Sequence, residues 1–370
     1  MVFVGAGHAH LHALKRCRAF IEAGHECVLV APDAFWYSGL ASGVLGGHYP
    51  PEMDRIDVAA LVESAGGRFI DDRVTTIDPR RKRLQLGSGA SLAYDVASLN
   101  VGSHTPPIAG EREFAATCYT AKPVERLFEL RATLSRIAGA GASPPRIVVA
   151  GGGPTAFELG ANLLGLAERL DARFDVAVAV VAGRGPVLGQ LPRRAARGLL
   201  DSLARRGLEI VHGERAAEVV DGGLVTDGGR RLACDHFINA TGLRPPALLR
   251  ESGLAVDDEG AMIVDEHLRS VSHPSVFGGG DCIRPAERAI DKVGVYAIRE
   301  APVLFDNTLA TLADEPPPAT FRPQKKYLWI MNLGDGTGLA ARGRLWYRGR
   351  LAFMLKDRID RRFLHSLRPS

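Results

Sequence analysis

The sequence of 370 residues has few cysteines, few aromatic side chains and no long hydrophobic run. The five cysteines (Cys17, Cys27, Cys118, Cys234 and Cys282) are scattered and form no CxxC pair. This pattern argues against a disulfide framework and against a zinc knuckle, and it fits a reducing cytoplasm. No apolar run approaches the roughly 18 residues that cross a bilayer. We therefore expect a cytoplasmic protein.

Composition and charge narrow the class further. With 46% hydrophobic and 24% charged residues, the chain is long enough for two packed domains of ordinary globular composition. The net charge of +4 hides an asymmetry, because residues 321–370 carry 12 Lys and Arg against 3 Asp and Glu, which leaves −5 for the rest. The basic character therefore belongs to the tail. We expect no nucleic-acid partner.

Two segments show the strand, glycine turn and helix of a dinucleotide-binding unit. The first, FVGAGHAHLHALKRCRAF, contains Gly5 and Gly7, and the second, RIVVAGGGPTAFELGANLLGLAERL, contains Gly151 and Gly153. The first glycine of such a unit permits the tight turn, and the second lets backbone N–H groups reach a pyrophosphate at the positive helix end. The repeat predicts an α/β fold with two Rossmann-like domains.

Histidines crowd the first glycine turn. His10 stands where the third glycine of the fingerprint is expected, a position that brings the helix close to the sheet. A metal site made of His8, His10 and His12 is the alternative, but His8 and His10 lie about 200° apart on a helix. We therefore expect no metal.

Neither unit shows a clear acid for the adenosine ribose, which normally follows the second strand. In the first unit Asp33 lies just beyond the expected position, and in the second the strand ends at Ala182-Gly183-Arg184 without a carboxylate. Arg184 either contacts a 2′-phosphate or is an ordinary solvated residue. The sequence predicts weak discrimination between NADH and NADPH, below about tenfold.

Two acids mark the candidate site. Asp281 follows three glycines at the end of the apolar strand SVFGGGD, where a ligand can approach the backbone and the acid can accept hydrogen bonds from its hydroxyls. Glu158 lies on the first turns of the second helix. There it either interacts with the helix dipole or points toward a nicotinamide and orders the reacting ring.

Together these motifs resemble the FAD- and NAD(P)H-dependent oxidoreductases with two dinucleotide-binding domains, the group that includes type II NADH dehydrogenases. The resemblance implies that VGAGHAH holds the FAD pyrophosphate, GGGPTAFELG the NAD(P)H, and FGGGD the FAD ribityl and phosphate region. The stretches WYSGLASGVLGGHYPPEMDRIDVAAL, YDVASLNVGS and LKDRIDRRF are similar to a bacterial subgroup associated with selenide, water dikinase. In that subgroup the glycine turn also carries histidines.

The resemblance also implies a division of the chain and a set of site residues. Residues 1–110 and 263–315 are expected to form the FAD-binding domain, 111–262 the NAD(P)H-binding domain, and 316–370 a C-terminal α+β extension. The candidate catalytic residues are Glu158, Lys122 and Lys292, although both lysines have the alternative of being surface charges. The expected cofactor-binding residues are Gly5, Gly7, His8, His10, Asp33, Gly102, Gly151, Gly153, Pro154, Thr155, Arg184, Gly242, Gly280, Asp281 and Val293.

We interpret the chain as an FAD-dependent NAD(P)H dehydrogenase that passes hydride from nicotinamide to flavin and on to a quinone-like or small-molecule acceptor. The missing CxxC argues against disulfide exchange, and the absence of any cysteine after Cys282 departs from sulfide:quinone oxidoreductases. The segment Gly294–Arg299 lacks both glutamines that type II dehydrogenases carry at the quinone site. The alternative function is a non-catalytic redox-sensing flavoprotein that engages a partner through its basic tail.

The tail itself shows a helical stripe. Within 351–367, apolar residues recur every four positions at Leu351, Leu355, Ile359, Phe363 and Leu367, while the basic residues lie mostly elsewhere on the helix. Such a helix can lie peripherally on the inner face of the cytoplasmic membrane, where apolar burial and attraction to anionic lipid act together. Alternatively it packs on its own chain or forms a homodimer.

Overall fold

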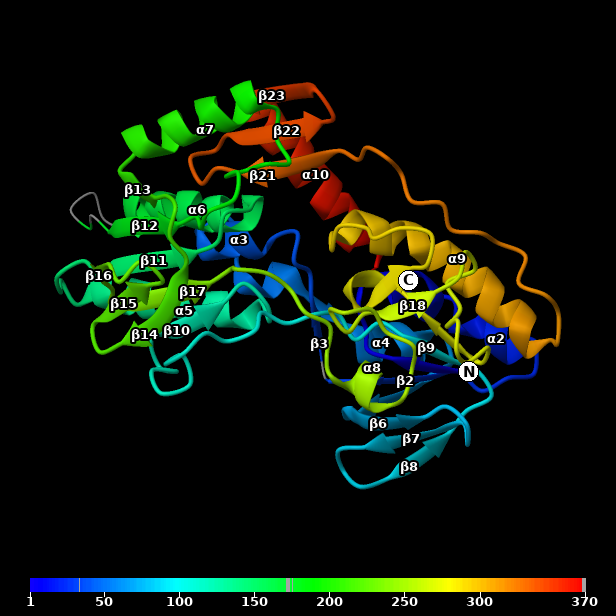
Figure 1. Ribbon diagram of the computed structural model, residues 1–370. Coiled ribbons are helices and arrows are strands. Elements are labelled where there is room, and N and C mark those ends of the chain that lie inside the picture. The colour runs from blue at the N-terminus through cyan, green and yellow to red at the C-terminus, as the bar shows by residue number, and fades with distance from the viewer. Residues whose placement is uncertain (33, 171–173, 175, 368–370) are drawn as a thin grey trace.

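The computed structural model describes residues 1–32, 34–170, 174 and 176–367. Two five-stranded sheets form the centres of two halves, which lie side by side in Figure 1. Their strand orders are β19-β9-β1-β2-β5 and β10-β17-β11-β12-β13, and all neighbours in both sheets are parallel. The predicted α/β class with two Rossmann-like sheets is confirmed.

The first sheet joins strands from both ends of the chain, because β19 pairs with β9. Every residue of β1, β2, β9 and β19 is buried, as expected for parallel strands covered by helices on both faces of the sheet. The strands are β1 (Val2–Val4), β2 (Val28–Ala31), β5 (Arg68–Asp71), β9 (Ala97–Leu99) and β19 (Val276–Gly278). The helices of this half are α1 (His8–Leu14), α2 (Cys17–Glu22), α4 (Val58–Ser64) and α9 (Gly294–Leu312), and α1 packs against α9.

The second sheet is built from the middle of the chain. It contains β10 (Cys118–Thr120), β11 (Arg146–Ala150), β12 (Ala177–Val181), β13 (Leu208–Val211) and β17 (His236–Asn239). Its helices are α5 (Glu125–Gly139), α6 (Pro154–Leu170) and α7 (Arg193–Arg205), and α3 (Ala41–Leu45) from the first half contacts α5 and α6.

Smaller elements surround the two sheets. The antiparallel meanders are β6 (Val74–Asp78), β7 (Arg83–Leu86) and β8 (Ser91–Ala93), and β14 (Ala216–Val220), β15 (Gly223–Thr226) and β16 (Arg231–Ala233). The strand pairs are β3 (Ala34–Trp36) with β4 (Arg55–Asp57) and β18 (Met262–Val264) with β20 (Ile283–Pro285). The remaining short helices are η1 (Pro51–Asp54), α8 (Leu248–Glu251) and η2 (Gly280–Cys282). Two segments that link the halves lie side by side, because His104 and Arg244 exchange backbone hydrogen bonds of 2.9 Å.

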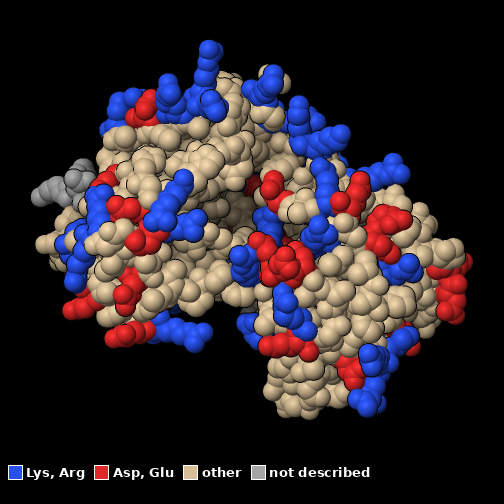
Figure 2. Space-filling view, viewed as in Figure 1, with Lys and Arg blue, Asp and Glu red and all other residues tan. Residues whose placement is uncertain are grey.

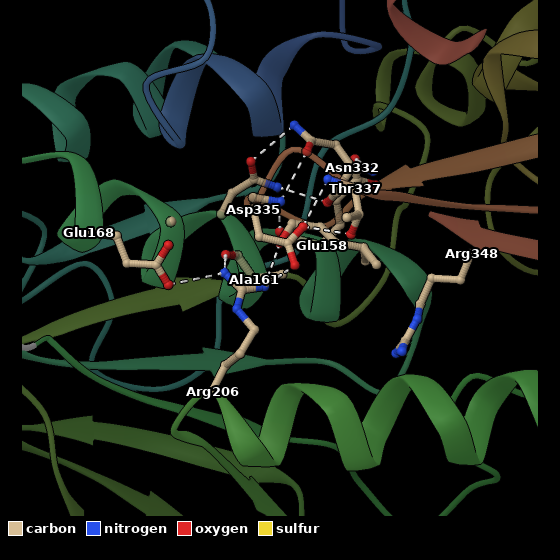
Figure 3. Close-up of polar contacts among 12 residues, drawn as sticks. Glu158, Ala161, Glu168, Arg206, Asn332, Asp335, Thr337 and Arg348 are labelled. Carbon is tan, nitrogen blue, oxygen red and sulfur yellow. Dashed lines mark hydrogen bonds and ion pairs between the residues drawn. The ribbon is translucent and has the colours of Figure 1, made fainter. Parts of the chain in front are cut away.

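The C-terminal part forms a three-stranded antiparallel sheet and a long helix at the top of Figure 1. These elements are β21 (Trp329–Asn332), β22 (Gly338–Arg342), β23 (Leu345–Gly349) and α10 (Arg350–Ser366). Arg206 fastens this sheet to the second half: it donates to the carbonyls of Leu333 (2.6 Å) and Ala161 (3.3 Å). Figure 3 shows Arg206 between Glu168 and Asp335, each 3.7 Å away.

The predicted apolar stripe on helix α10 is exposed to solvent in its first part and packed against the chain in its last part. Leu351, Leu355 and Ile359 are exposed, whereas Phe363 packs on the first half and Leu367 is buried. The division has a geometric cause, because residues four apart advance about 40° beyond a full turn and the stripe winds around the helix. The end of the helix thus packs on its own chain, and its beginning presents apolar side chains to solvent. Within the described ranges no helix is long and apolar enough to cross a membrane.

Candidate active site

A cavity of about 430 Å³, called the first cavity, lies at the carboxyl ends of the strands of the first sheet. Ligands of open parallel sheets bind at this edge. Its lining includes the first glycine turn, the end of β2, the end of β9, η2 and the start of α9. The lining residues used below are Gly5, Gly7, His8, Asp72, Arg73, Asn100, Gly102, Ser103, Lys122, Gly280, Asp281 and Gly294.

The first glycine turn is held by Asn100, a residue that the sequence analysis missed. Gly5 has φ +83°, and a Cβ atom there would lie 2.5 Å from the Asn100 carbonyl oxygen, so a larger residue does not fit. The Asn100 side chain accepts from the Ala9 N–H (3.2 Å) and donates to the Gly279 carbonyl (2.5 Å). Asn100 therefore joins the two glycine segments expected to hold one ligand.

His10 lies beneath this turn and not in the first cavity. Its ring is fully buried, with Nδ1 2.6 Å from the Gly5 carbonyl and Nε2 2.8 Å from Ser98 Oγ. Because a carbonyl only accepts, Nδ1 carries the proton and Nε2 accepts from Ser98. Burial lowers the pKa of His10 to about 4, so the ring is neutral at pH 7. The structure gives His10 a supporting role instead of the expected cofactor contact.

His8, in contrast, lines the first cavity. Its ring stacks on Phe363 of α10, with centroids 5.9 Å apart, and meets Phe35 edge-on at 5.0 Å. Burial, and to a lesser extent the charge of Lys122, lowers the pKa of His8 to about 4. No group of three or more His, Cys, Asp or Glu side chains in the described part of the chain could hold a metal ion.

Asp281 is the acid of the first cavity. Its Oδ2 accepts from Ser103 Oγ (2.6 Å) and from Lys122 Nζ (2.5 Å). Burial alone would raise the pKa of Asp281, but the charge of Lys122 and these hydrogen bonds outweigh it, so the pKa lies below the ordinary value. The loop before it is fixed by Gly280 N–H, which donates to buried Glu300 (2.6 Å). Asp281 is thus a fixed, ionised carboxylate in the lining of the first cavity.

A second cavity, of about 590 Å³, adjoins the first. Four residues line both cavities: Ser38, Lys122, Val124 and Gly294. Figure 2 shows a hollow between the two halves of the molecule. The predicted residues Gly153, Pro154, Thr155, Glu158, Gly242, Lys292 and Val293 all line the second cavity. The structure therefore brings the second glycine turn and Lys122 to one place.

Glu158 is held by segments distant in the sequence. Its Oε1 accepts from Ser42 Oγ of the first half (2.7 Å) and from the Asn332 N–H of the C-terminal sheet (3.0 Å). Figure 3 shows Glu158 next to Asn332. Burial raises the pKa of Glu158, and the positive charge of Lys356 opposes the rise. Its contacts outside α6 favour a role in the cavity over a role at the helix dipole.

The two remaining lysines of the second cavity come from different parts of the chain. Lys292 forms an ion pair with Glu259 (2.8 Å). Lys356 of α10 reaches the same cavity and pairs with Asp360 (2.7 Å). Lys356 was not among the predicted site residues, because in the sequence it stands with the other basic side chains of the tail helix. Its position three residues before Ile359 carries no signal of a cavity.

The other predicted residues lie as follows. Gly102 lines the first cavity with φ +68°. Gly151 lines neither cavity, and a Cβ there would lie 2.5 Å from the Ala240 carbonyl oxygen, so it shapes the turn. Arg184 lies outside both cavities. Asp33 lies outside the described residues. Asp72 and Arg73, which were not predicted, line the first cavity.

Comparison with known proteins identifies the family. The model of the pyridine nucleotide-disulphide oxidoreductases matches residues 1–301, most of the chain. The chain belongs to this family. Its cofactors, FAD and NAD(P)H, agree with two glycine turns that each open into one of two adjoining cavities.

Individual relatives of this pyridine nucleotide-disulphide oxidoreductase match only part of the chain. An NADH dehydrogenase-like protein of Mycobacterium tuberculosis is 30% identical over 234 residues, which cover 61% of this chain and 58% of that protein. A type II NADH:quinone oxidoreductase of Haemophilus influenzae is 27% identical over 179 residues, covering 44% of this chain and 40% of that one. The matched parts thus span about half the length of these relatives.

Solved structures share the fold across nearly the whole chain. NDH2 of Plasmodium falciparum in complex with NADH superposes with a TM-score of 0.82 at 14% identity, covering 98% of this chain and 96% of that one. The sulfide:quinone oxidoreductase of Aquifex aeolicus gives 0.81 at 16% identity, covering 99% and 91%. At these identities the likeness shows the fold alone.

The residues present fit both cofactors. A dinucleotide pyrophosphate lies close to the backbone of a glycine turn, and Gly7 of the first turn and Gly153 of the second line the two cavities without a side chain. Asp281, Ser103 and Lys122 offer polar partners for the ribityl chain of FAD, and Thr155, Glu158 and Lys292 offer them for the nicotinamide nucleotide. When bound, FAD supplies the two-electron chemistry that protein side chains lack.

Proposed function

We propose that this chain is an FAD-dependent NAD(P)H dehydrogenase, with FAD in the first cavity, the nicotinamide nucleotide in the second, and hydride transfer between them. The observation that carries the proposal is the junction of the cavities at Lys122 and Gly294. Bound rings that meet there would be held in reacting distance, which removes much of the entropic barrier to transfer. The division into residues 1–110 with 263–315, 111–262 and 316–370 remains part of this proposal.

The protein's own groups have three tasks in this reaction. Asp281 binds hydroxyls of the flavin side chain and is kept ionised by Lys122. Glu158, which lines the second cavity, orients the nicotinamide. Helix α9 begins at Gly294, which lines both cavities, so its positive end can stabilise negative charge that develops there.

The electron acceptor is a small molecule, and a quinone-like compound is one candidate. Val295 and Arg299 stand in the segment where type II dehydrogenases carry glutamines, which weakens the case for their quinone site. Tyr327, Trp329 and Ile330 line the second cavity and offer apolar surface to such an acceptor. The likeness to the subgroup associated with selenide, water dikinase extends this proposal to selenium compounds as acceptors.

The number of nicotinamide equivalents consumed per flavin distinguishes an enzyme from a redox sensor. The purified protein is mixed with excess NADH or NADPH and a panel of quinones, small electrophiles and oxidised selenium compounds. An enzyme consumes many equivalents of nicotinamide per flavin with at least one acceptor. Consumption that stops near one equivalent with every acceptor would favour a sensor.

We further propose that the exposed apolar side chains of β23 and α10 bind an anionic membrane surface. This exposed apolar set consists of Leu345, Trp346, Tyr347, Leu351, Met354, Leu355 and Ile359. It belongs to the tail that carries +9 of charge, and Figure 2 shows Lys and Arg side chains along the upper edge of the molecule, where this sheet lies. A second copy would bring the same positive charge against itself, whereas anionic lipid would neutralise it.

The double substitution Leu351→Gln and Met354→Gln should weaken binding to phosphatidylglycerol vesicles at least tenfold. Each leucine-sized side chain contributes about 1.5–3 kcal/mol when fully buried. Co-sedimentation at low and high salt measures the effect, and FAD content should not change because neither residue lines a cavity. Val271→Gln, at an exposed apolar position elsewhere, is the control. A stable dimer that the double variant breaks, without vesicle binding in the parent, would contradict this proposal.

A further inference from the structure

A groove of about 590 Å³, called the α7 groove, lies between helix α7 and strand β13, which ends the strand order of the second sheet. The lining residues used below are Leu208 and Ile210 of β13, His212 directly after it, and Arg193, Arg197 and Leu200 of α7. None of them lines the first or the second cavity. The groove is therefore separate from the proposed cofactor and nicotinamide sites, and the proposed reaction does not use it.

The two ends of the α7 groove differ in character. Because β12 and β13 are parallel neighbours, the connecting helix α7 runs antiparallel to them and begins at the carboxyl ends of the strands. Arg193 and Arg197, in the first two turns of α7, therefore lie at the same end of the groove as His212. The positive end of the helix dipole adds to their charge. Leu200 lies further along α7 and Leu208 begins β13, so the other end of the groove is apolar.

The arginines at the basic end are unpaired. In the described part of the chain, neither the Arg193 nor the Arg197 side chain takes part in a hydrogen bond or an ion pair. Asp201, one turn after Arg197, is the one acid among the described residues that line the groove. Glu209 of β13 does not line it and pairs with Arg230 (3.1 Å). Figure 2 shows Lys and Arg side chains where α7 lies, at the upper left. The basic end therefore offers unpaired positive charge to a ligand.

The groove opens away from the C-terminal sheet. Arg348 of β23, labelled in Figure 3, donates to the carbonyl of Gly198 on α7 (3.0 Å). At 3.6 residues per turn, Gly198 lies about 140° around the helix from Arg193. The tail, which we propose to bind a membrane, therefore covers a different flank of α7 from the one that lines the groove. This arrangement favours a partner other than the membrane.

We propose that the α7 groove binds an acidic peptide segment of a partner protein. Carboxylates of the segment pair with Arg193 and Arg197, because a guanidinium group matches a carboxylate in charge and in geometry. Apolar side chains next to these acids pack on Leu200 and Leu208 at the other end. From Arg193 to Ala204 the groove extends about 16 Å along the helix axis, the length of about five residues of an extended segment. Such a segment can also add to a sheet edge, the place that β13 occupies.

Binding of defined peptides to the full chain tests the groove. The probes are two fluorescein-labelled peptides, Leu-Val-Leu-Glu-Glu-Glu and its reverse, because the groove does not specify the direction of the segment. At least one of them should bind saturably in fluorescence anisotropy titrations. The double substitution Arg193→Gln and Arg197→Gln should weaken this binding at least about tenfold, since it removes both charged partners of the acids. Replacing the apolar residues of the peptide by serine should also weaken it at least about tenfold.

The control is the double substitution Arg194→Gln and Arg205→Gln, which removes the same charge from α7 at exposed positions outside the groove. It should leave the peptide affinity unchanged. Both variants should keep the wild-type flavin content, because none of the four arginines lines the first or the second cavity. Equal weakening in the two double variants, or no saturable binding of either peptide, would overturn the proposal. Binding to phosphatidylglycerol vesicles that is lost only with Arg193 and Arg197 would assign the groove to the membrane instead.

Discussion

Replacing Asp281 by alanine should release most of the bound FAD. The carboxylate lines the first cavity and is held by Ser103 and Lys122, so its loss removes a fixed, charged partner of the bound FAD. Hydrogen bonds to a charged group contribute about 1.5–3 kcal/mol, which corresponds to an affinity loss of about ten- to hundredfold. The ratio of flavin to protein absorbance after gel filtration measures the change.

Two controls distinguish the loss of a contact to FAD from the loss of the protein's fold. Asp258→Ala removes an exposed acid of the same half and should keep the wild-type flavin content. Asp281→Ala loaded with excess FAD should regain its colour, because only affinity is reduced. If the Asp281→Ala protein retains FAD at the wild-type ratio after gel filtration, Asp281 is not a ligand of the flavin side chain.

Replacing Glu158 by glutamine should slow the bleaching of flavin absorbance by NAD(P)H about ten- to hundredfold while FAD stays bound. The amide oxygen can still accept from Ser42 and from the Asn332 N–H, so the packing persists and only the charge toward the nicotinamide is lost. A loss of this size corresponds to about 1.4–2.7 kcal/mol of transition-state stabilisation. Anaerobic stopped-flow spectroscopy measures the rate.

The pH profile distinguishes this role from a structural one. Burial raises the pKa of Glu158, so in the wild type the rate should rise with pH as the carboxyl ionises, and in Glu158→Gln this limb should be absent. Glu168→Gln, on the same helix but exposed, should behave as wild type. An unchanged rate in Glu158→Gln would contradict the role at the nicotinamide and leave Glu158 only its interaction with the helix dipole.

The fold followed from local patterns in the sequence. Short apolar strands running into Gly5 and Gly151 specify strand, turn and helix within some twenty residues, and the structure shows both units. These glycines could be recognised in the sequence because a backbone conformation such as that of Gly5, with φ +83°, excludes most other residues. Family membership required only these local signals and the FGGGD segment.

The site depended on contacts between distant segments, which the sequence could not supply. Asn100 joins two glycine segments, and Lys356 enters the second cavity from the last helix. Each of these contacts joins segments that lie far apart along the chain, so no local pattern predicts it. His10 is the opposite case: it lies inside a recognised motif, yet it contacts the Gly5 carbonyl and Ser98 and does not line the cavity.

An anaerobic titration of the purified protein with NADPH and with NADH shows whether hydride passes from a nicotinamide nucleotide to bound FAD. We expect a yellow protein whose flavin absorbance is bleached by one equivalent of nicotinamide nucleotide and returns when an acceptor is added, over repeated cycles. A colourless protein that cannot be reconstituted with FAD, or a bound flavin that neither nicotinamide bleaches, would contradict it.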